Sequence, residues 1–221
     1  VQMQSVGEVM AIGRNFTESI QKAFRSLEVG LSGLEQRIDS KKDPDLSRVK
    51  KLDMSALRYG TCFRLLKIKE AFIQNISIER INKVTGIDPW FLYYIEKISK
   101  MTLNNKIREL KRNGFSDIQI ASLNNKNEEE VRAERKSKKI VPSFKIVDTC
   151  AAEFSAKTPY CYSTYEEENE IRPLEGEKII ILGGGPNRIG QGIEFDYCCV
   201  QAVFGLKDQG FKTIMINCNP E

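Results

Sequence analysis

A glycine-dense segment near the C-terminal end carries the residues with the clearest chemical potential. It has the sequence GGGPNRIGQGIE, residues 183–194, and it follows a short apolar run, KIIIL. A strand that enters a glycine turn and then a helix is the usual layout of a phosphate-binding loop, because the free N–H groups at a helix N-terminus favour anions. The segment is therefore a candidate nucleotide site.

Neither nucleotide-binding template fits this segment. The dinucleotide pattern G-x-G-x-x-G finds Arg188 in place of its last glycine, and Asn217 stands where an acidic residue would bind a ribose hydroxyl. The Walker pattern finds Gln191 and Gly192 in place of its Lys and its Ser or Thr. Two interpretations remain open. Either the glycines only let the strand turn tightly into the helix, or Arg188 and Glu194 at the helix start handle a small anion.

The composition excludes several classes of chemistry. The 221 residues include no histidine, and the six cysteines form no CxxC pair. Zinc sites of the Cys/His type, His-based triads and a His general base are therefore excluded, and we predict no catalytic residue and no metal site. Thiols scattered through a chain of this length suggest a reducing compartment, so we expect a cytoplasmic protein.

The overall balance is that of a globular protein without a membrane segment. Hydrophobic residues make up 41% and charged residues 29% of the chain, and the net charge of +4 is mild. The apolar runs are far shorter than the roughly 20 residues that span a bilayer. The chain begins with Val1 rather than Met, so we expect a piece of a longer protein.

The sequence pattern of residues 15–140 predicts a series of short helices. Asn15 is the expected N-cap of the first, and Gly30 is its expected end. Further helices are expected to begin at or near Asp43, Cys62, Ser77, Asp88, Asn104, Ser116 and Asn127, with Gly86 and Gly114 at helix ends. No strand-like alternation of useful length occurs before residue 140.

The C-terminal third changes character. A proline-containing stretch after residue 140 predicts extended chain that passes into a linker. Residues 178–182 then predict a buried strand, 192–209 a helix and 212–218 a second strand, which together form one βαβ unit. A lone βαβ unit cannot bury its own sheet, so we expect a truncated domain. The predicted fold is a mainly α-helical domain followed by a truncated, Rossmann-like α/β unit.

An alternative function comes from residues 77–98, which have the layout of a helix-turn-helix nucleic-acid-binding protein. A basic tail after the next such unit could contact phosphates, and its residues are Arg132, Arg135, Lys136, Lys138 and Lys139. Against this, the expected recognition helix presents aromatic rather than base-reading side chains (Trp90, Phe91, Tyr93 and Tyr94), and the run NEEEV would repel a duplex. Aromatic residues at this density are more typical of a core or a protein interface.

Several motifs together resemble one family. The runs GGGPNRIGQGIEFDYCCV and INCNPE closely resemble the start of the second synthetase half of the large subunit of carbamoyl phosphate synthetase. MQSVGEVMAIGRNFTESIQKAFRSLE resembles the join between that subunit's first ATP-grasp unit and its oligomerisation domain. IDPWFLYYIEKI, LKRNGFSDIQIA and FKIVDTCAAEFSAKTPYCYSTYEEENE resemble later parts of the same domain.

The resemblance implies three regions. Residues 1–15 would be the end of the first ATP-grasp unit, and 16–170 the helical oligomerisation domain with an extended C-terminal segment. Residues 171–221 would start the second synthetase half with a pre-ATP-grasp α/β domain. Residues 31–70 match least.

The resemblance also implies a function for the intact enzyme. The family makes carbamoyl phosphate, for arginine and pyrimidine synthesis, from bicarbonate, ammonia released from glutamine by a separate small subunit, and two ATP. It passes the labile carbamate through an internal tunnel. By their place in the motifs, the tunnel-lining residues here would be Arg188, Gly192, Glu194 and Glu221, although an ion pair of Arg188 that only fixes the loop is the plainer alternative.

The same resemblance implies the partners and cofactors. ATP and Mg²⁺ (or Mn²⁺) would belong to the intact enzyme, with no cofactor in this segment, which we expect to be inactive alone. The expected partners are the glutaminase small subunit and further copies of the large subunit, bound through the helical domain. We expect neither nucleic acid nor membrane as a partner.

Overall fold

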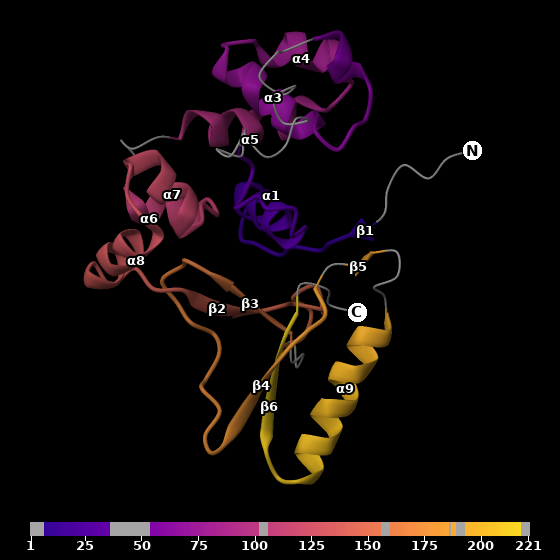
Figure 1. The fold of residues 1–221 in the computed structure, drawn as a ribbon, viewed down its shortest axis with the longest axis vertical. Coiled ribbons are helices and arrows are strands. Elements are labelled where there is room, and N and C mark those ends of the chain that lie inside the picture. The colour runs from indigo at the N-terminus through magenta and orange to yellow at the C-terminus, as the bar shows by residue number, and fades with distance from the viewer. Residues whose placement is uncertain are drawn as a thin grey trace.

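A computed structural model describes residues 7–35, 54–101, 106–155, 160–185, 187–188 and 193–217, with no side-chain detail at 7–8, 56, 187–188 and 193–195. Helices gather at one end of the molecule, a two-stranded antiparallel sheet follows, and an α/β unit lies at the opposite end (Figure 1). The prediction of a helical domain followed by a truncated α/β unit is confirmed.

The helical part consists of short segments joined by tight turns. Its described elements are α1 (Phe16–Ser26), the 3-10 helix η1 (Ser55–Arg58), α3 (Arg64–Ile73), α4 (Ile78–Thr85), α5 (Pro89–Lys100), α6 (Ile107–Arg112), α7 (Asp117–Asn124) and α8 (Glu128–Ser137). The starts predicted from N-cap chemistry are confirmed, because a side-chain oxygen accepts a backbone N–H at Ser77, Asp88, Ser116 and Asn127. The helix predicted from Asp43 and the start predicted at Asn104 lie outside the described residues.

The two ends of α1 differ in how well the sequence predicts them. Asn15 is the N-cap, and its side-chain oxygen accepts the N–H of Glu18 at 2.9 Å. The predicted end at Gly30 is wrong, because the helix ends at Ser26 and Glu28 already takes left-handed backbone with φ of +54°. Gly86 and Gly114 do follow α4 and α6 in left-handed backbone, as predicted.

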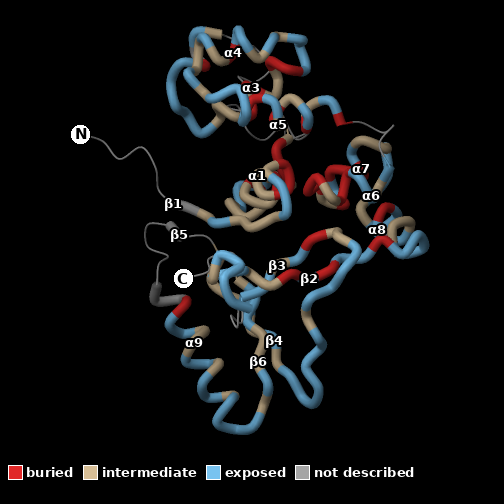
Figure 2. Tube along the Cα trace, turned by 180° about the vertical axis from the view of Figure 1, so that it is seen from behind, coloured by how far each residue is buried: buried red, intermediate tan, exposed pale blue. Residues whose placement is uncertain are grey.

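The hydrophobic core lies within the helical part. Its largest fully buried apolar side chains are Leu34, Leu57, Ile68, Ile81, Leu92, Ile95, Ile98, Leu110 and Ile120. Figure 2 shows buried segments on these helices and on the antiparallel sheet, whereas the α/β unit is mostly intermediate or exposed. Burial of apolar surface therefore stabilises the helical part far more than the α/β unit.

The extended stretch after residue 140 forms an antiparallel pair. Strand β2 (Ser143–Ile146) pairs with β3 (Cys161–Thr164), with Ser143 opposite Thr164. Lys22 of α1 donates through Nζ to the Ser163 carbonyl at 2.5 Å, so this sheet is fixed to the first helix.

The α/β unit is a single parallel crossover. Strand β4 (Lys178–Leu182) pairs in parallel with β6 (Lys212–Ile216), and α9 (Ile193–Asp208) connects them, close to the predicted bounds. Apolar side chains of both strands are exposed, with Ile180 at 57% and Leu182 at 73%. Two strands cannot bury a parallel sheet, which agrees with a truncated domain.

A very short strand pair joins the start of the chain to the glycine-rich segment. Strand β1 (Gly7–Glu8) pairs antiparallel with β5 (Asn187–Arg188), with Gly7 opposite Arg188 and Glu8 opposite Asn187. The sequence did not predict β1, because two residues are too few to show an alternating pattern.

Candidate functional site

The first glycine of the loop makes room for a side chain of the protein itself. The Gly183 N–H donates to the Ile216 carbonyl at 2.7 Å, which continues the β4–β6 pairing by one residue. A Cβ at this position would lie 2.4 Å from Cγ of Asn217, far below a normal contact distance. Glycine is therefore required here by close packing of strand ends, without any phosphate.

Asn217 lies between the loop and the helix. Its Nδ2 donates to Oδ1 of Asp196 at 2.9 Å, and Asp196, in the first turn of α9, is 9% exposed. The other amide atom, Oδ1, is also buried, and none of the described residues donates a hydrogen bond to it. At the position where a dinucleotide fold has a ribose-binding acid, this chain has an amide that ties β6 to α9.

A second loop glycine faces the helical part. Gly185 has left-handed backbone, with φ of +85°. A Cβ at Gly185 would lie 3.2 Å from Oε1 and 3.5 Å from Oε2 of Glu28, so both carboxylate oxygens lie on the side of Gly185 where a side chain would project. The chain just beyond α1 therefore lies beside the loop.

The structure places the four predicted tunnel residues only in part. Arg188 lies in β5, opposite Gly7, and Glu194 lies in the first turn of α9, each with its backbone alone described. Gly192 and Glu221 lie outside the described residues. The distances among the four side chains and the tunnel itself therefore remain predictions.

One residue that we did not single out from the sequence lies beside them. The β1–β5 pairing brings Glu8 opposite Asn187, next to Arg188. The signal that could have found it is its place in SVGEVMAIG, within a segment that already resembled the family.

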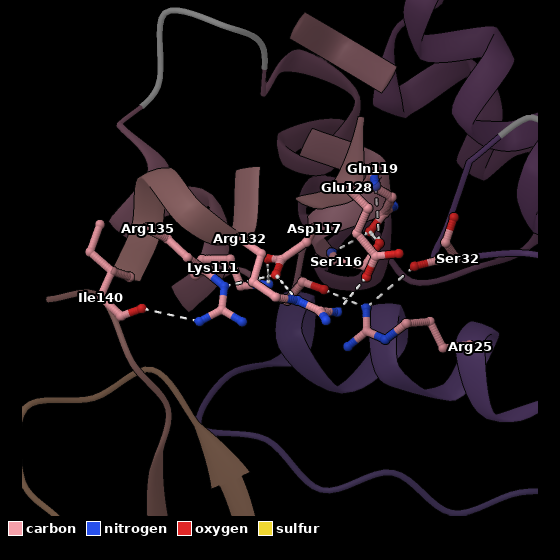
Figure 3. A network of polar contacts seen from close by, with 11 residues as sticks. Arg25, Ser32, Lys111, Ser116, Asp117, Gln119, Glu128, Arg132, Arg135 and Ile140 are labelled. Carbon is pink, nitrogen blue, oxygen red and sulfur yellow. Dashed lines mark hydrogen bonds and ion pairs between the residues drawn. The ribbon is translucent and has the colours of Figure 1, made fainter. Parts of the chain in front are cut away.

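A separate polar network connects α1, α6, α7 and α8 around a cavity of about 200 Å³ (Figure 3). The buried Lys111 and Asp117 form an ion pair at 2.8 Å, and Arg135 bonds the other carboxylate oxygen at 2.7 Å. Arg25 donates through one terminal nitrogen to the carbonyls of Gly114, at 2.6 Å, and Ser32, at 3.4 Å.

The electrostatics of this network indicate a structural role. Burial lowers the pKa of Lys111, although its ion pair with Asp117 opposes the shift. Burial alone would raise the pKa of Asp117, but the hydrogen bonds from Lys111 and Arg135 outweigh it, so the carboxyl pKa lies below its usual value. The Lys111 ammonium also lies 4.7 Å from the centre of the Tyr165 ring. These charged groups pair with one another, so the network is better suited to holding the helices together than to binding a ligand.

A second buried carboxylate joins three segments of the chain. Glu18 is 2% exposed, and it pairs with Lys22 at 2.8 Å. Its Oε2 accepts the backbone N–H of Arg14 at 2.7 Å and the hydroxyl of Thr164 at 3.1 Å. This glutamate therefore holds the segment before α1, the helix itself and strand β3 together.

Three of the five basic residues proposed for nucleic-acid binding are held in ion pairs. Arg132 pairs with Glu128 at 2.8 Å, Lys138 pairs with Glu134 at 2.6 Å, and Arg135 belongs to the buried network around Asp117. Among the described residues, no three His, Cys, Asp or Glu side chains are grouped to hold a metal ion. No helix in the described ranges is long and apolar enough to cross a bilayer.

Comparisons with known proteins agree along the whole chain. Residues 8–139 match the family model of the carbamoyl-phosphate synthetase large chain, oligomerisation domain, and residues 175–221 match that of the carbamoyl phosphate synthase preATP-grasp domain. Carbamoyl phosphate synthase large chains from Pseudomonas aeruginosa, Archaeoglobus fulgidus and Buchnera aphidicola are 48%, 49% and 50% identical. Each alignment covers 100% of this chain and 21% of the relative, so the chain spans about a fifth of the length of these relatives. The nucleic-acid-binding alternative gains no support. The chain belongs to the carbamoyl phosphate synthase large chain family, of which it represents an internal segment.

Proposed function

We propose that the protein containing this segment makes carbamoyl phosphate from bicarbonate, glutamine-derived ammonia and two ATP, and that the segment joins its two synthetase halves. The support is the order of the two matched family models along one chain and the identity of about 48% across all of it. ATP and Mg²⁺ (or Mn²⁺) would bind in the remaining parts of the enzyme. The loop of this segment lacks the Lys and hydroxyl residues of a phosphate site.

The observation that carries the joining role is the β1–β5 pair. By the bounds that the resemblance implies, Gly7 and Glu8 would lie at the end of the first synthetase half, where the oligomerisation-domain match begins, whereas Asn187 and Arg188 lie in the preATP-grasp match that would start the second. These four residues hydrogen-bond directly as one small sheet. A passage that carries carbamate from one half to the other has to cross the joint between them, and the glycine-rich loop lies at that joint.

The loop chemistry suits a passage for a labile anion. Arg188 supplies a permanent cation, and pairing with one acidic residue, Glu194 or Glu221, would balance its charge, so that the wall is polar without binding carbamate tightly. Glycine at position 192 would leave the passage open, because it has no side chain to narrow it. Excluding bulk water from such a passage protects the intermediate from decomposition.

The test uses the complete enzyme carrying Glu194→Ala. Bicarbonate-dependent ATP hydrolysis in the first half should persist, while carbamoyl phosphate formation falls about tenfold, which corresponds to a barrier raised by about 1.4 kcal/mol. Glu175→Ala, an exposed acid before β4, is the matched control and should change neither rate. An equal loss of both rates in Glu194→Ala would contradict a passage role.

The segment by itself is expected to be inactive. The purified 221-residue chain should show no bicarbonate-dependent ATP turnover, because it would lack the ATP-binding parts. Measurable turnover above a buffer blank would contradict the assignment of ATP and metal binding to the rest of the enzyme.

The helical part is proposed to bind further copies of the large chain, as the name of its family model suggests. Trp90, Phe91 and Tyr93 of α5 are 51%, 43% and 54% exposed, and Phe16 packs against Trp90 with ring centres 5.2 Å apart. Such an aromatic surface is typical of a protein interface. Light scattering at rising concentration should show association, and a constant monomer mass would contradict this role for the segment. We further propose a cytoplasmic enzyme with a separate glutaminase small subunit.

A further inference from the structure

Glu28 occupies a backbone position that suits glycine. In the described helices, the residue that leaves the helix in left-handed backbone is Gly or Asn after α3, α4, α6, α7 and α9, namely Asn75, Gly86, Gly114, Asn125 and Gly210. After two other helices a residue with a longer side chain takes this left-handed conformation. These residues are Glu28 after α1 and Lys139 after α8, and φ is +54° for both. A longer L side chain is strained in this region, whereas glycine is not.

The side chain of Glu28 lies beside the glycine-rich loop. Its two carboxylate oxygens would lie 3.2 Å and 3.5 Å from a Cβ built on Gly185, and its Cδ would lie 3.6 Å from it. Gly185 belongs to the glycine-rich loop, 157 positions further along the chain. A strained glutamate at the end of α1 thus presents a negative charge to this loop, which continues into Asn187 and Arg188.

We propose that Glu28 is a positioning residue whose carboxylate holds the glycine-rich loop, at residues 183–185, beside the C-terminal end of α1. The carboxylate lies beside Gly185, whereas Asn217 packs on Gly183 of the same loop. The strained backbone of Glu28 lowers the stability of the end of α1, whereas its side chain fixes the position of the loop. Such strain is often retained at functional sites. The loop needs this support whether or not carbamate passes it.

The proposal predicts that one substitution at Glu28 stabilises the helical part and at the same time loosens the glycine-rich loop. Glu28→Gly should relieve the strain at the end of α1 and raise the melting midpoint of the helical part by about 2–4 °C. Trp90 fluorescence measures this midpoint, because Trp90 packs on Phe16 of α1. The same substitution should speed amide hydrogen exchange in peptides covering residues 183–188 about tenfold, because the loop loses a charged partner.

Lys139→Gly is the matched control. Lys139 has the same φ and also lies two residues beyond the end of its helix, with its N–H bonded to the Lys136 carbonyl at 2.9 Å. This substitution should raise the midpoint similarly and leave loop exchange unchanged. Glu28→Gln keeps the size of the side chain and removes its charge, so it should speed loop exchange without raising the midpoint.

These measurements on the 221-residue chain decide the proposal. Faster loop exchange in both Glu28 variants, but not in Lys139→Gly, is the expected result. Loop exchange in Glu28→Gly equal to that in Lys139→Gly would overturn it, and so would full loop protection in Glu28→Gln.

A second experiment rests on the proposed function and can fail separately. In the complete enzyme, Glu28→Gln should preserve bicarbonate-dependent ATP hydrolysis and lower the carbamoyl phosphate formed per ATP consumed. If loop exchange rises while this yield stays constant, Glu28 positions the loop but the passage role of the loop is wrong.

Discussion

Gly183→Ala is the sharpest test of the loop geometry. The new Cβ would lie 2.4 Å from Cγ, 2.6 Å from Oδ1 and 2.8 Å from Cβ of Asn217. Asn217 could retreat only by breaking its 2.9 Å hydrogen bond to Asp196, a carboxylate that is 9% exposed. Overpacking costs about 1–3 kcal/mol, and a lost hydrogen bond to a charged group costs about 1.5–3 kcal/mol. We expect the β4–β6 sheet to lose about 2.5–6 kcal/mol of local stability.

The assay has to report on the α/β unit itself. Trp90 lies in α5 of the helical part, so its fluorescence would miss a local change in the sheet. Native-state hydrogen exchange of the β4 and β6 amides gives the opening free energy directly. Gly205→Ala is the matched control, because a Cβ there meets nothing within 4 Å and alanine should favour α9 by about 0.5–1 kcal/mol.

A double-mutant cycle isolates the contact. In an Asn217→Gly background all three side-chain atoms that the new methyl group meets are gone, so Gly183→Ala should cost less than about 1 kcal/mol. A cost that is the same in both backgrounds would refute the packing argument. So would a Gly183→Ala protein that opens no more readily than Gly205→Ala.

Two further predictions concern the helical part, and both use urea unfolding followed by Trp90 fluorescence. Asp117→Asn should cost about 3–5 kcal/mol at pH 7, because the buried Lys111 and the partly buried Arg135 lose their counter-ion. Since the pKa of Asp117 is lowered in the folded state, the unaltered chain should lose this advantage as the pH falls below about 4, whereas the variant should not. An equal pH dependence in both proteins would contradict the assignment. Gln21→Leu should cost about 2–6 kcal/mol, because its Oε1 accepts the Leu34 N–H at 2.6 Å and Gln119 Nε2 at 3.0 Å, and both donors would be left buried. A cost under about 1 kcal/mol would show that both donors find other acceptors.

Local sequence chemistry predicts the helix starts in this chain, but it misplaces the end of α1. A start depends on one short polar side chain, such as Ser116, that bonds a backbone N–H within three residues, and this is local chemistry. The end of α1 was misplaced at Gly30, because Glu28, whose side chain lies beside Gly185 of the distant loop, already takes the left-handed position that glycine usually takes. Local preference cannot reveal a partner so far along the chain.

The candidate site could also be predicted only in part from the sequence. The failure of both nucleotide templates followed from the residue types at Arg188 and Gln191. The packing of Asn217 on Gly183, and the pairing that brings Glu8 to the loop, depend on tertiary structure and had no signal in composition or spacing. Family resemblance supplied the tunnel hypothesis, and the structure adds the β1–β5 pairing, which we propose as the joint that such a tunnel would cross.

The β1–β5 pair also constrains the order in which the chain folds. Gly7 and Arg188 are 181 positions apart, so during synthesis at about 5–20 residues per second the first strand waits roughly 10–35 s for its partner. The helical part has emerged by then, and its local contacts form much faster than that. Docking of β3 through Glu18 then shortens the loop that remains to be closed and lowers its entropic cost. The four-residue β1–β5 sheet is too small to form on its own. It can therefore form late in folding, once the intervening helices have folded and brought its two strands together.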